Sequence, residues 1–281
     1  MNTIFIAALL FTFNNTPVTD MREGPSQDTK MDSQAMYAER VEIIEEKDDW
    51  AKVKTSDDYC AWLKKSTLYY SNVNFPENKD ATIAIVNRNA AHLYHITGTE
   101  YGPILTLPFE SKLEVVDQLG DFNGRWIKVR LLNNSFAYIQ RGDVILNPRL
   151  LSRNEIVSFS KQFLGLPYTY GGRSSFGYDC SGFVQMIYRQ MGLSIPRNSS
   201  DQSQWEGFRD VDVKDLQEGD LIFFGRKTGK VGHVGMYLGE NQFIHANVLE
   251  NKPYIIISDL NKAPWNCSEL LPYRIARRLK E

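Results

Sequence analysis

The sequence lacks the features that mark several classes of protein. Its 281 residues include only three cysteines, Cys60, Cys180 and Cys267, and no C-x-x-C pair, which argues against a disulfide framework and a structural zinc site. No apolar run reaches the ~20 residues that span a bilayer, so no integral membrane segment is expected. The 32 basic and 34 acidic side chains give a formal charge of −2, which argues against a strongly basic nucleic-acid-binding protein.

The amino terminus is open to more than one interpretation. Residues 4–13 form an apolar run, but no Lys or Arg precedes it and no A-x-A cleavage site follows it. Residues 1–16 therefore form a signal peptide, a first β-strand or a disordered end. We favour export, to the cell envelope, the periplasm or the medium, over a cytoplasmic location.

A repeated pattern predicts a duplicated all-β region in residues 18–148. The pattern W-A-K-V, turn, A-W-L begins at Trp50, and W-I-K-V, turn, A-Y-I begins at Trp126, 76 residues later. The W-x-K-V segments alternate as half-buried strands do. Such a repeat is typical of small barrels of short strands, so we expect one barrel at 17–80 and another at 81–148. The alternative is two unrelated β-hairpins.

The C-terminal half has helical as well as strand patterns. Ser152 and Glu155 match a capping box, which predicts a first helix, and a second helix is expected over about 180–191. Four strands are expected afterwards, at Leu221–Phe224, His233–Leu238, Gln242–Asn247 and Tyr254–Ser258. Helices followed by a run of antiparallel strands predict an α+β domain in residues 149–281.

Cys180 is the candidate nucleophile. Asp179 is a natural N-cap for the second helix, so Cys180 stands where free backbone N–H groups and the helix dipole favour negative charge and should lower the thiol pKa. A catalytic thiol also needs a histidine base that a third group orients. His233 and His245 are 12 residues apart around the turn 239–241. An odd loop would place both on one face of a hairpin, and an even loop would separate them.

These residues lie in motifs that resemble the NlpC/P60 family of cell-wall cysteine peptidases. The matching segments, in order, are GLPYTYGG (165–172), DCSGFV (179–184), PRNSSDQ (196–202), LQEGDLIFF (216–224), and HVGMYLG (233–239) with FIHA (243–246). The resemblance implies a papain-like α+β fold without a cofactor. It also implies cleavage of the bond between D-glutamate and a diamino acid in peptidoglycan stem peptides.

The resemblance further implies roles for individual residues. Cys180 would be the nucleophile, His233 the general base and acid, and His245 the group that orients His233. The backbone N–H of Cys180 is a natural donor to the oxyanion. Substrate-binding positions are expected at Tyr168, Asp179, Ser181 and Ser199. Of these, Asp179 would suit the free amine of the substrate.

The all-β region resembles bacterial SH3 domains. The arrangement of two such domains before a peptidase domain resembles that of the γ-D-glutamyl-L-diamino-acid endopeptidases that need a free N-terminal L-Ala. In those enzymes the first SH3 domain closes one end of the cleft. Tyr59 matches the tyrosine of D-G-Y-x-G-W that faces the active site, although Asp58 and Ala61 replace the two glycines. Glu23 is the candidate for the acidic residue of an R-x-E-P turn, but it stands one place off.

The remaining candidates have structural interpretations. His92 and His95 form an H-x-x-H pair without further ligands, so no metal site is expected. Arg197 and Gln202 are expected to tie a loop to the core. Peptidoglycan stem peptides or muropeptides are the expected partners, nucleic acid is not, and the oligomeric state is open. Two alternatives to this peptidase stay open: an inert wall-binding SH3 scaffold, and amidase or acyl-transfer chemistry on the same fold.

Overall fold

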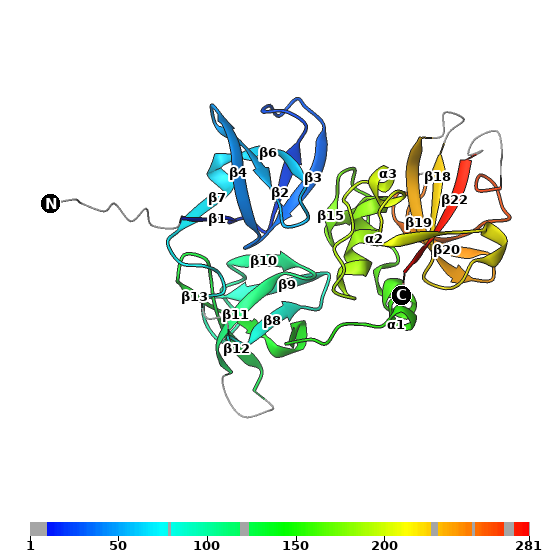
Figure 1. Cartoon of the computed structure of the whole chain (residues 1–281). Coiled ribbons are helices and arrows are strands. Elements are labelled where there is room, and N and C mark those ends of the chain that lie inside the picture. Colours follow the sequence, from blue (N-terminus) through cyan, green and yellow to red (C-terminus); the bar gives the residue numbers. More distant parts are fainter. Residues whose placement is uncertain are drawn as a thin grey trace. The chain divides into compact units, whose positions relative to one another are not determined.

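The computed structural model describes residues 10–77, 80–118, 124–225, 230–248, 251–266 and 273–280. The chain divides into two compact units, and many of their elements are labelled in Figure 1. The first unit contains most of residues 1–148, and the second contains residues 149–281. Two short segments of the N-terminal half, Met31–Ser33 and Asp57–Tyr59, belong to the second unit. Residues distant in sequence therefore share the unit that holds the candidate nucleophile.

The first unit contains two seven-stranded sheets with equivalent strand orders, β3-β2-β6-β5-β4-β1-β7 and β10-β9-β13-β12-β11-β8-β14. The strands of the first sheet are β1 (Phe11–Asn14), β2 (Val18–Arg22), β3 (Met31–Met36), β4 (Arg40–Lys47), β5 (Trp50–Lys54), β6 (Cys60–Lys64) and β7 (Leu68–Ser71). Those of the second are β8 (Ile83–Val86), β9 (Ala90–Tyr94), β10 (Leu105–Pro108), β11 (Lys112–Gln118), β12 (Trp126–Arg130), β13 (Phe136–Gln140) and β14 (Val144–Leu146). In each sheet a 3₁₀ turn, Lys65–Thr67 or Arg141–Asp143, precedes the last strand.

The W-x-K-V motifs form the strands that the alternation predicts. In β5, Ala51 and Val53 are fully buried while the lysines stay partly exposed, and β12 repeats this burial pattern. Each motif pairs with the strand after it in the same register, Trp50 opposite Lys64 and Trp126 opposite Gln140. Each also pairs with a bulged strand, β4 or β11, and such bulges increase the local twist that small sheets need to curl.

Strand β1 lies within residues 1–16, the segment that the sequence allows to be a signal peptide, a first β-strand or a disordered end. Residues 11–14 pair with β4 on one side and β7 on the other, and Phe13 is buried in the core that the two sheets share. The first sheet therefore starts at residue 11, earlier than the boundary expected at residue 17. Removal of residues 1–16 would take an interior strand out of this sheet.

The second unit is an α+β unit built on a six-stranded sheet with the order β17-β22-β18-β19-β20-β21. Its strands are β17 (Phe208–Val211), β18 (Leu221–Gly225), β19 (Val231–Gly239), β20 (Gln242–Ala246), β21 (Ile255–Asp259) and β22 (Tyr273–Leu279), beside the two-stranded β15 (Arg173–Ser174) and β16 (Gly177–Tyr178). Its helices are α1 (Arg153–Ser160), α2 (Cys180–Arg189) and α3 (Ser199–Gln202), with 3₁₀ turns at Lys161–Phe163 and Val213–Asp215. Helix α2 packs on β19 and β20 (Figure 1).

The two longer helices start where the sequence predicts. The capping box of Ser152 and Glu155 is present at the start of α1. At the start of α2, Asp179 accepts a hydrogen bond of 2.7 Å from the backbone N–H of Gly182. Every residue of α2 from Cys180 to Tyr188 is buried, so this helix lies inside the unit. Within the described ranges, no helix has the length and apolar composition needed to cross a membrane.

Candidate active site

His233 and His245 lie on the same face of the β19–β20 hairpin. Met236 pairs with Ile244, which places Gly235 opposite His245 and His233 one diagonal step away. The Nε2 atom of His233 and the Nδ1 atom of His245 are 2.8 Å apart, a hydrogen bond. The loop between the paired residues Gly239 and Gln242 has two residues, so it is even and not odd. A β-bulge between Tyr237 and Gly239 shifts the register by one residue and brings the two histidines to the same face.

Gly235 leaves the space that this arrangement needs. A Cβ atom at this position would lie 2.6 Å from Cδ2 of Phe243 and 3.1 Å from Cβ of His245. We expect Gly235→Ala to lower the free energy of unfolding by about 1–3 kcal/mol, measured by urea denaturation, because the added methyl group overpacks the hairpin. Gly232→Ala on the same strand is the control, since a Cβ there meets nothing within 4 Å. Equal losses in both variants would contradict this reading of Gly235.

Ser258 and Trp265 complete the surroundings of His245, and neither is predicted by the sequence. The Nε2 atom of His245 is 3.0 Å from Oγ of Ser258 on the adjacent strand β21. The Trp265 ring stacks against His233 at a centroid distance of 5.3 Å and meets His245 edge-on at 4.7 Å. Phe243 stacks on the other imidazole, that of His245, at 4.6 Å. The two rings therefore sit in an apolar setting, and His245 is fully buried.

Cys180 is the first residue of α2 and is 8% exposed. The backbone N–H groups of Val234 and Ser181 are hydrogen-bonded to its sulfur, so the thiol lies beside β19, at the residue that follows His233 in the sequence. Burial, followed by the negative charge of Asp179, raises the pKa of the thiol to about 12. The lowered pKa expected from the helix start is therefore wrong. That expectation counted the helix N-terminus and left out the cost of burying the charge.

Both imidazoles of the site are held in their neutral form. Burial lowers the pKa of His233 to about 4, although the negative charge of Asp179 acts in the opposite direction. Burial and the neighbouring His233 lower the pKa of His245 well below its usual value. At neutral pH the site therefore pairs a neutral thiol with a neutral imidazole that has a free nitrogen lone pair. Such a pair can transfer a proton at the moment of attack.

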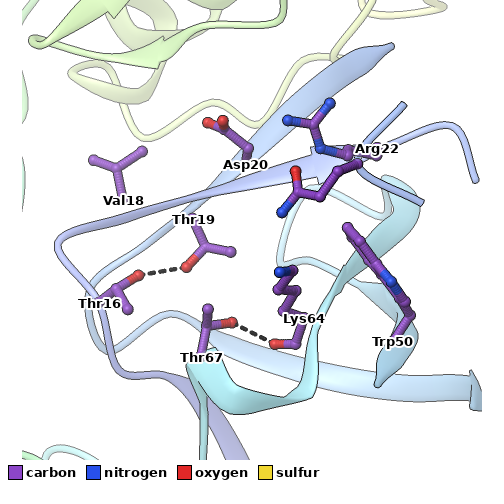
Figure 2. Close-up of a pocket in the computed structure, with 9 residues that line it drawn as sticks. Thr16, Val18, Thr19, Asp20, Arg22, Trp50, Lys64 and Thr67 are labelled. Carbon is purple, nitrogen blue, oxygen red and sulfur yellow. Dashed lines mark hydrogen bonds between the residues drawn. The ribbon is translucent and has the colours of Figure 1, made fainter. Parts of the chain in front are cut away.

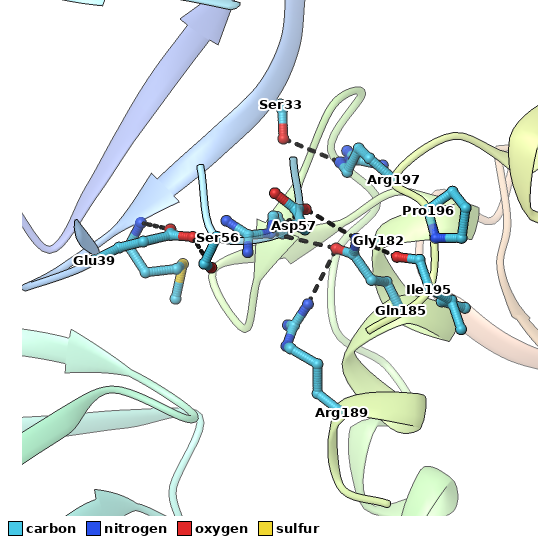
Figure 3. Close-up of polar contacts among 12 residues, drawn as sticks. Ser33, Glu39, Ser56, Asp57, Gly182, Gln185, Arg189, Ile195, Pro196 and Arg197 are labelled. Carbon is cyan, nitrogen blue, oxygen red and sulfur yellow. Dashed lines mark hydrogen bonds and ion pairs between the residues drawn. The ribbon is translucent and has the colours of Figure 1, made fainter. Parts of the chain in front are cut away.

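Asp179 is occupied by a buried arginine. Arg197 is fully buried and donates to both carboxylate oxygens of Asp179, at 3.0 and 2.7 Å. The same guanidinium donates to Oγ of Ser181 at 3.0 Å and to Oγ of Ser33 at 3.1 Å, the latter drawn in Figure 3. Gln202 donates to the backbone carbonyls of Ser181 and Pro196. Arg197 and Gln202 thus tie their loop to the start of α2, as expected.

The segment Asp57–Tyr59 is anchored in the second unit by buried polar groups. The Oδ2 atom of Asp57 accepts from Nε2 of Gln185 at 2.9 Å (Figure 3). The same atom is 3.5 Å from Nε of Arg173. The Asp57 and Arg173 side chains are 5% and 4% exposed, so this ion pair is shielded from solvent. Asp58 has φ +61°, the left-handed conformation that explains why glycine is usual in this motif.

The segment Met31–Ser33 supplies an acidic residue that the sequence does not single out. Tyr59 donates from its hydroxyl to Oδ2 of Asp32 at 2.5 Å, and burial raises the pKa of Tyr59 above its usual value. Gly171 makes room for this segment: it has φ +71°, and a Cβ there would lie 3.1 Å from the backbone of Asp32. Glu23, the acidic candidate from the sequence, is exposed and belongs to the first unit.

The other predicted residues fall into two groups. Tyr168 is partly buried, and its pKa is raised by burial and by the neighbouring Cys180, so a neutral phenol stands near the thiol. Ser199 begins α3 and is partly exposed. Outside the site, Nδ1 of His92 is 2.8 Å from Oγ1 of Thr106, and Cys60 is exposed. Cys267 lies outside the described residues. Among the residues that the structure describes, no group of three His, Cys, Asp or Glu side chains could hold a metal ion.

A cavity of about 270 Å³ lies in the first sheet (Figure 2). Its lining is Thr16, Val18, Thr19, Asp20, Arg22, Gln27, Trp50, Lys64 and Thr67. Several of its polar groups already have partners, since Arg22 donates to the carbonyl of Thr29 at 2.6 Å and Asp20 accepts from Gln34 at 3.1 Å. Nothing in this cavity carries the chemistry of the thiol and the histidines.

Two family profiles match the chain. The profile described as "NlpC/P60 family" matches residues 165–272, which include Cys180, His233 and His245. The profile described as "Bacterial dipeptidyl-peptidase Sh3 domain" matches residues 21–68, within the first sheet.

Individual proteins are similar over most of the chain. A γ-D-glutamyl-L-lysine dipeptidyl-peptidase of Bacillus cereus is 33% identical over 81% of this chain and 70% of its own length. A protein of the same name from Bacillus subtilis is 30% identical over 81% of this chain and 76% of its own length. The crystal structure of an NlpC/P60 family protein from Bacillus cereus matches with a TM-score of 0.80 and 25% identity, over 96% of this chain and 99% of the other.

Proposed function

This chain belongs to the NlpC/P60 family of cysteine peptidases, and on that premise we propose that it hydrolyses the bond between γ-D-glutamate and a diamino acid in peptidoglycan stem peptides. The observation that carries this proposal is the similarity to the two γ-D-glutamyl-L-lysine dipeptidyl-peptidases, which spans 81% of the chain. That span includes both an SH3-like region and the peptidase region.

In the proposed mechanism Cys180 is the nucleophile and His233 is the base. Because Nε2 of His233 is bonded to His245, Nδ1 is the atom that takes the thiol proton. The sulfur attacks the γ-carbonyl carbon of D-glutamate, the C–N bond breaks, and His233 returns the proton to the leaving amine. Water then loses a proton to His233 and attacks the thioester, which releases the acyl group as L-Ala-D-Glu and regenerates the thiol.

Two groups beside Cys180 are suited to the charge that develops on the carbonyl oxygen. The backbone N–H of Cys180 lies in the first turn of α2, where N–H groups have no partner within the helix. The phenol of Tyr168 stays neutral at working pH, because its pKa is raised, and can donate a hydrogen bond. Both donors are available without the movement of a charged group.

We assign recognition of the free amine to Asp32 and Tyr59 in place of Asp179. The carboxylate of Asp179 is bound bidentately by Arg197, whereas Asp32 is partly exposed and is held by the Tyr59 hydroxyl. A carboxylate beside a phenol oxygen suits an ammonium group. Ser33, the neighbour of Asp32, bonds to the same Arg197 that binds Asp179, which fixes this segment beside the start of α2.

We expect a free N-terminal amine to be required. L-Ala-γ-D-Glu-L-Lys should be cleaved about 10–100-fold more efficiently than its N-acetylated form, because acetylation removes the charge that Asp32 would pair with. Asp32→Asn should raise KM for the free tripeptide and reduce the discrimination between the two substrates, measured by release of L-Ala-D-Glu. Asp28→Asn is the control, since Asp28 is exposed and belongs to the first unit. Unchanged discrimination in Asp32→Asn would contradict this assignment.

The bond itself is tested by product analysis. Purified protein is incubated with L-Ala-γ-D-Glu-L-Lys and, separately, with the diaminopimelate tripeptide, and the products are identified by mass spectrometry. We expect L-Ala-D-Glu and the free diamino acid from at least one of them. Absence of both products, or cleavage after L-Ala, would overturn the proposed specificity.

We also propose that the second sheet is a second SH3-like module, so that the domains are residues 11–80, 81–148 and 149–281. The support is the equivalent order of the two sheets and the equivalent registers at Trp50 and Trp126. The family profile for the SH3 domain matches the first of these modules.

A further inference from the structure

We propose that Ser258 is a positioning residue that sets which nitrogen atoms of His245 and His233 carry protons. This inference rests on the proposed function, because it concerns the same thiol and base. It extends the Cys180–His233–His245 set by a fourth member, on a strand that none of the sequence motifs includes.

The geometry is a row of three side chains across three adjacent strands. His233 on β19 and His245 on β20 are one diagonal step apart, and Ser258 is the next step on β21 because His245 pairs with Ile256. The two contacts in the row are 2.8 Å and 3.0 Å long. Because side chains alternate between the faces of a sheet, these three share one face.

The row can carry its protons in only two ways while both rings are neutral. If the Ser258 oxygen accepts from Nε2–H of His245, then Nδ1 of His245 accepts from Nε2–H of His233, and Nδ1 of His233 keeps a free lone pair. If the direction is reversed, Nδ1 of His233 carries a proton and cannot accept one from the thiol. The first arrangement is the productive one.

The reaction itself demands the first arrangement. When His233 takes the proton of Cys180, both of its nitrogen atoms carry protons, so Nδ1 of His245 must accept and Nε2 of His245 must donate. The Ser258 oxygen is then the acceptor for that N–H. Since His245 is fully buried, an N–H without this acceptor would be an unpaired donor away from water.

The other groups around the row do not replace Ser258. The ionisable neighbours are Cys180, Asp179 and Tyr168 on the side of the thiol, and the charge of Asp179 acts on His233. Trp265, whose carbonyl accepts from Arg274, and Phe243 present ring faces and edges to the histidines. Asp259, next to Ser258 in β21, pairs with Lys262.

The test compares Ser258→Val with Ser258→Thr in the full-length chain labelled with ¹⁵N-histidine. The valine and threonine side chains have nearly the same shape, but only threonine keeps the hydroxyl of Ser258. We expect NMR to show the Nε2–H form of His245 and His233 in the wild type and in Ser258→Thr. In Ser258→Val, His245 should shift towards the Nδ1–H form, because an unpaired acceptor is tolerated better than an unpaired buried donor. His92 and His95, in the first unit, are internal references.

Activity supplies the second readout. We expect Ser258→Val to lower kcat by about 10–100-fold with little change in KM, and Ser258→Thr to restore most of it. An Nδ1–H form of His245 in the wild type, or an unchanged Nε2–H form and kcat in Ser258→Val, would overturn the proposal. The NMR readout needs no substrate, so failure to cleave γ-D-glutamyl peptides would refute the proposed function and leave this test intact.

Discussion

Cys180→Ala is expected to abolish hydrolysis of the tripeptide, with a loss in kcat of roughly 10⁴-fold or more. The variant keeps the buried site and both histidines, but it has no atom that can form the acyl-enzyme. The remaining base could activate water only, without a covalent intermediate. Release of L-Ala-D-Glu is followed by mass spectrometry over long incubations, and calorimetry with the intact tripeptide tests whether the variant still binds substrate.

Cys60→Ala is the matched control for this prediction. Cys60 is an exposed cysteine in the first unit, so its loss should leave kcat and KM unchanged. A Cys180→Ala variant with substantial activity would refute the thiol mechanism. It would then favour a reaction in which His233 activates water directly. Calorimetry would detect a Cys180→Ala variant that does not bind the tripeptide, and circular dichroism would detect one that does not fold. In that case Cys180→Ser would be tested in its place.

The sequence predicts the histidine pair because the connection between its strands is short. Between His233 and His245 the chain makes one tight turn of two residues, and the β-bulge between Tyr237 and Gly239 supplies the extra residue that lets both side chains face the same way. Ser258 is joined to His245 through a longer connection between β20 and β21, and its register cannot be counted from the spacing. The only signal for Ser258 in the sequence is a hydroxyl residue in the next strand, and such residues are too common to predict a partner of His245.

Long-range contacts explain the other differences between sequence and structure. Asp179 could be predicted as an N-cap from its neighbours, but its pairing with Arg197 depends on how a separate loop folds back. Asp32 reaches the second unit from β3, and no local pattern distinguishes it from other exposed acidic residues in the first sheet. The thiol pKa was predicted in the wrong direction because burial is a tertiary property, and at Cys180 it outweighs the helix N-terminus.

Arg197→Met is expected to cause the largest loss of stability, about 3–5 kcal/mol in the free energy of unfolding. The methionine fills similar space, but it leaves the carboxylate of Asp179 buried without its cation and removes donors to Ser181 and Ser33. Urea denaturation measures the loss. Amide hydrogen exchange should locate it at the start of α2 and in the segment Met31–Ser33, since the guanidinium joins them.

Two further variants distinguish an uncompensated charge from a simple loss of packing. Adding Asp179→Asn to Arg197→Met should recover part of the stability, because a neutral amide is far less costly to bury than an unpaired carboxylate. Lys214→Met removes the same charge from an exposed pair with Asp212 and should leave stability unchanged. The contradicting outcome is additivity: the double variant would lose, relative to Arg197→Met, the same free energy of unfolding that Asp179→Asn costs alone. The two residues would then not be coupled, and the ion pair would not be what holds the Arg197 loop against the start of α2.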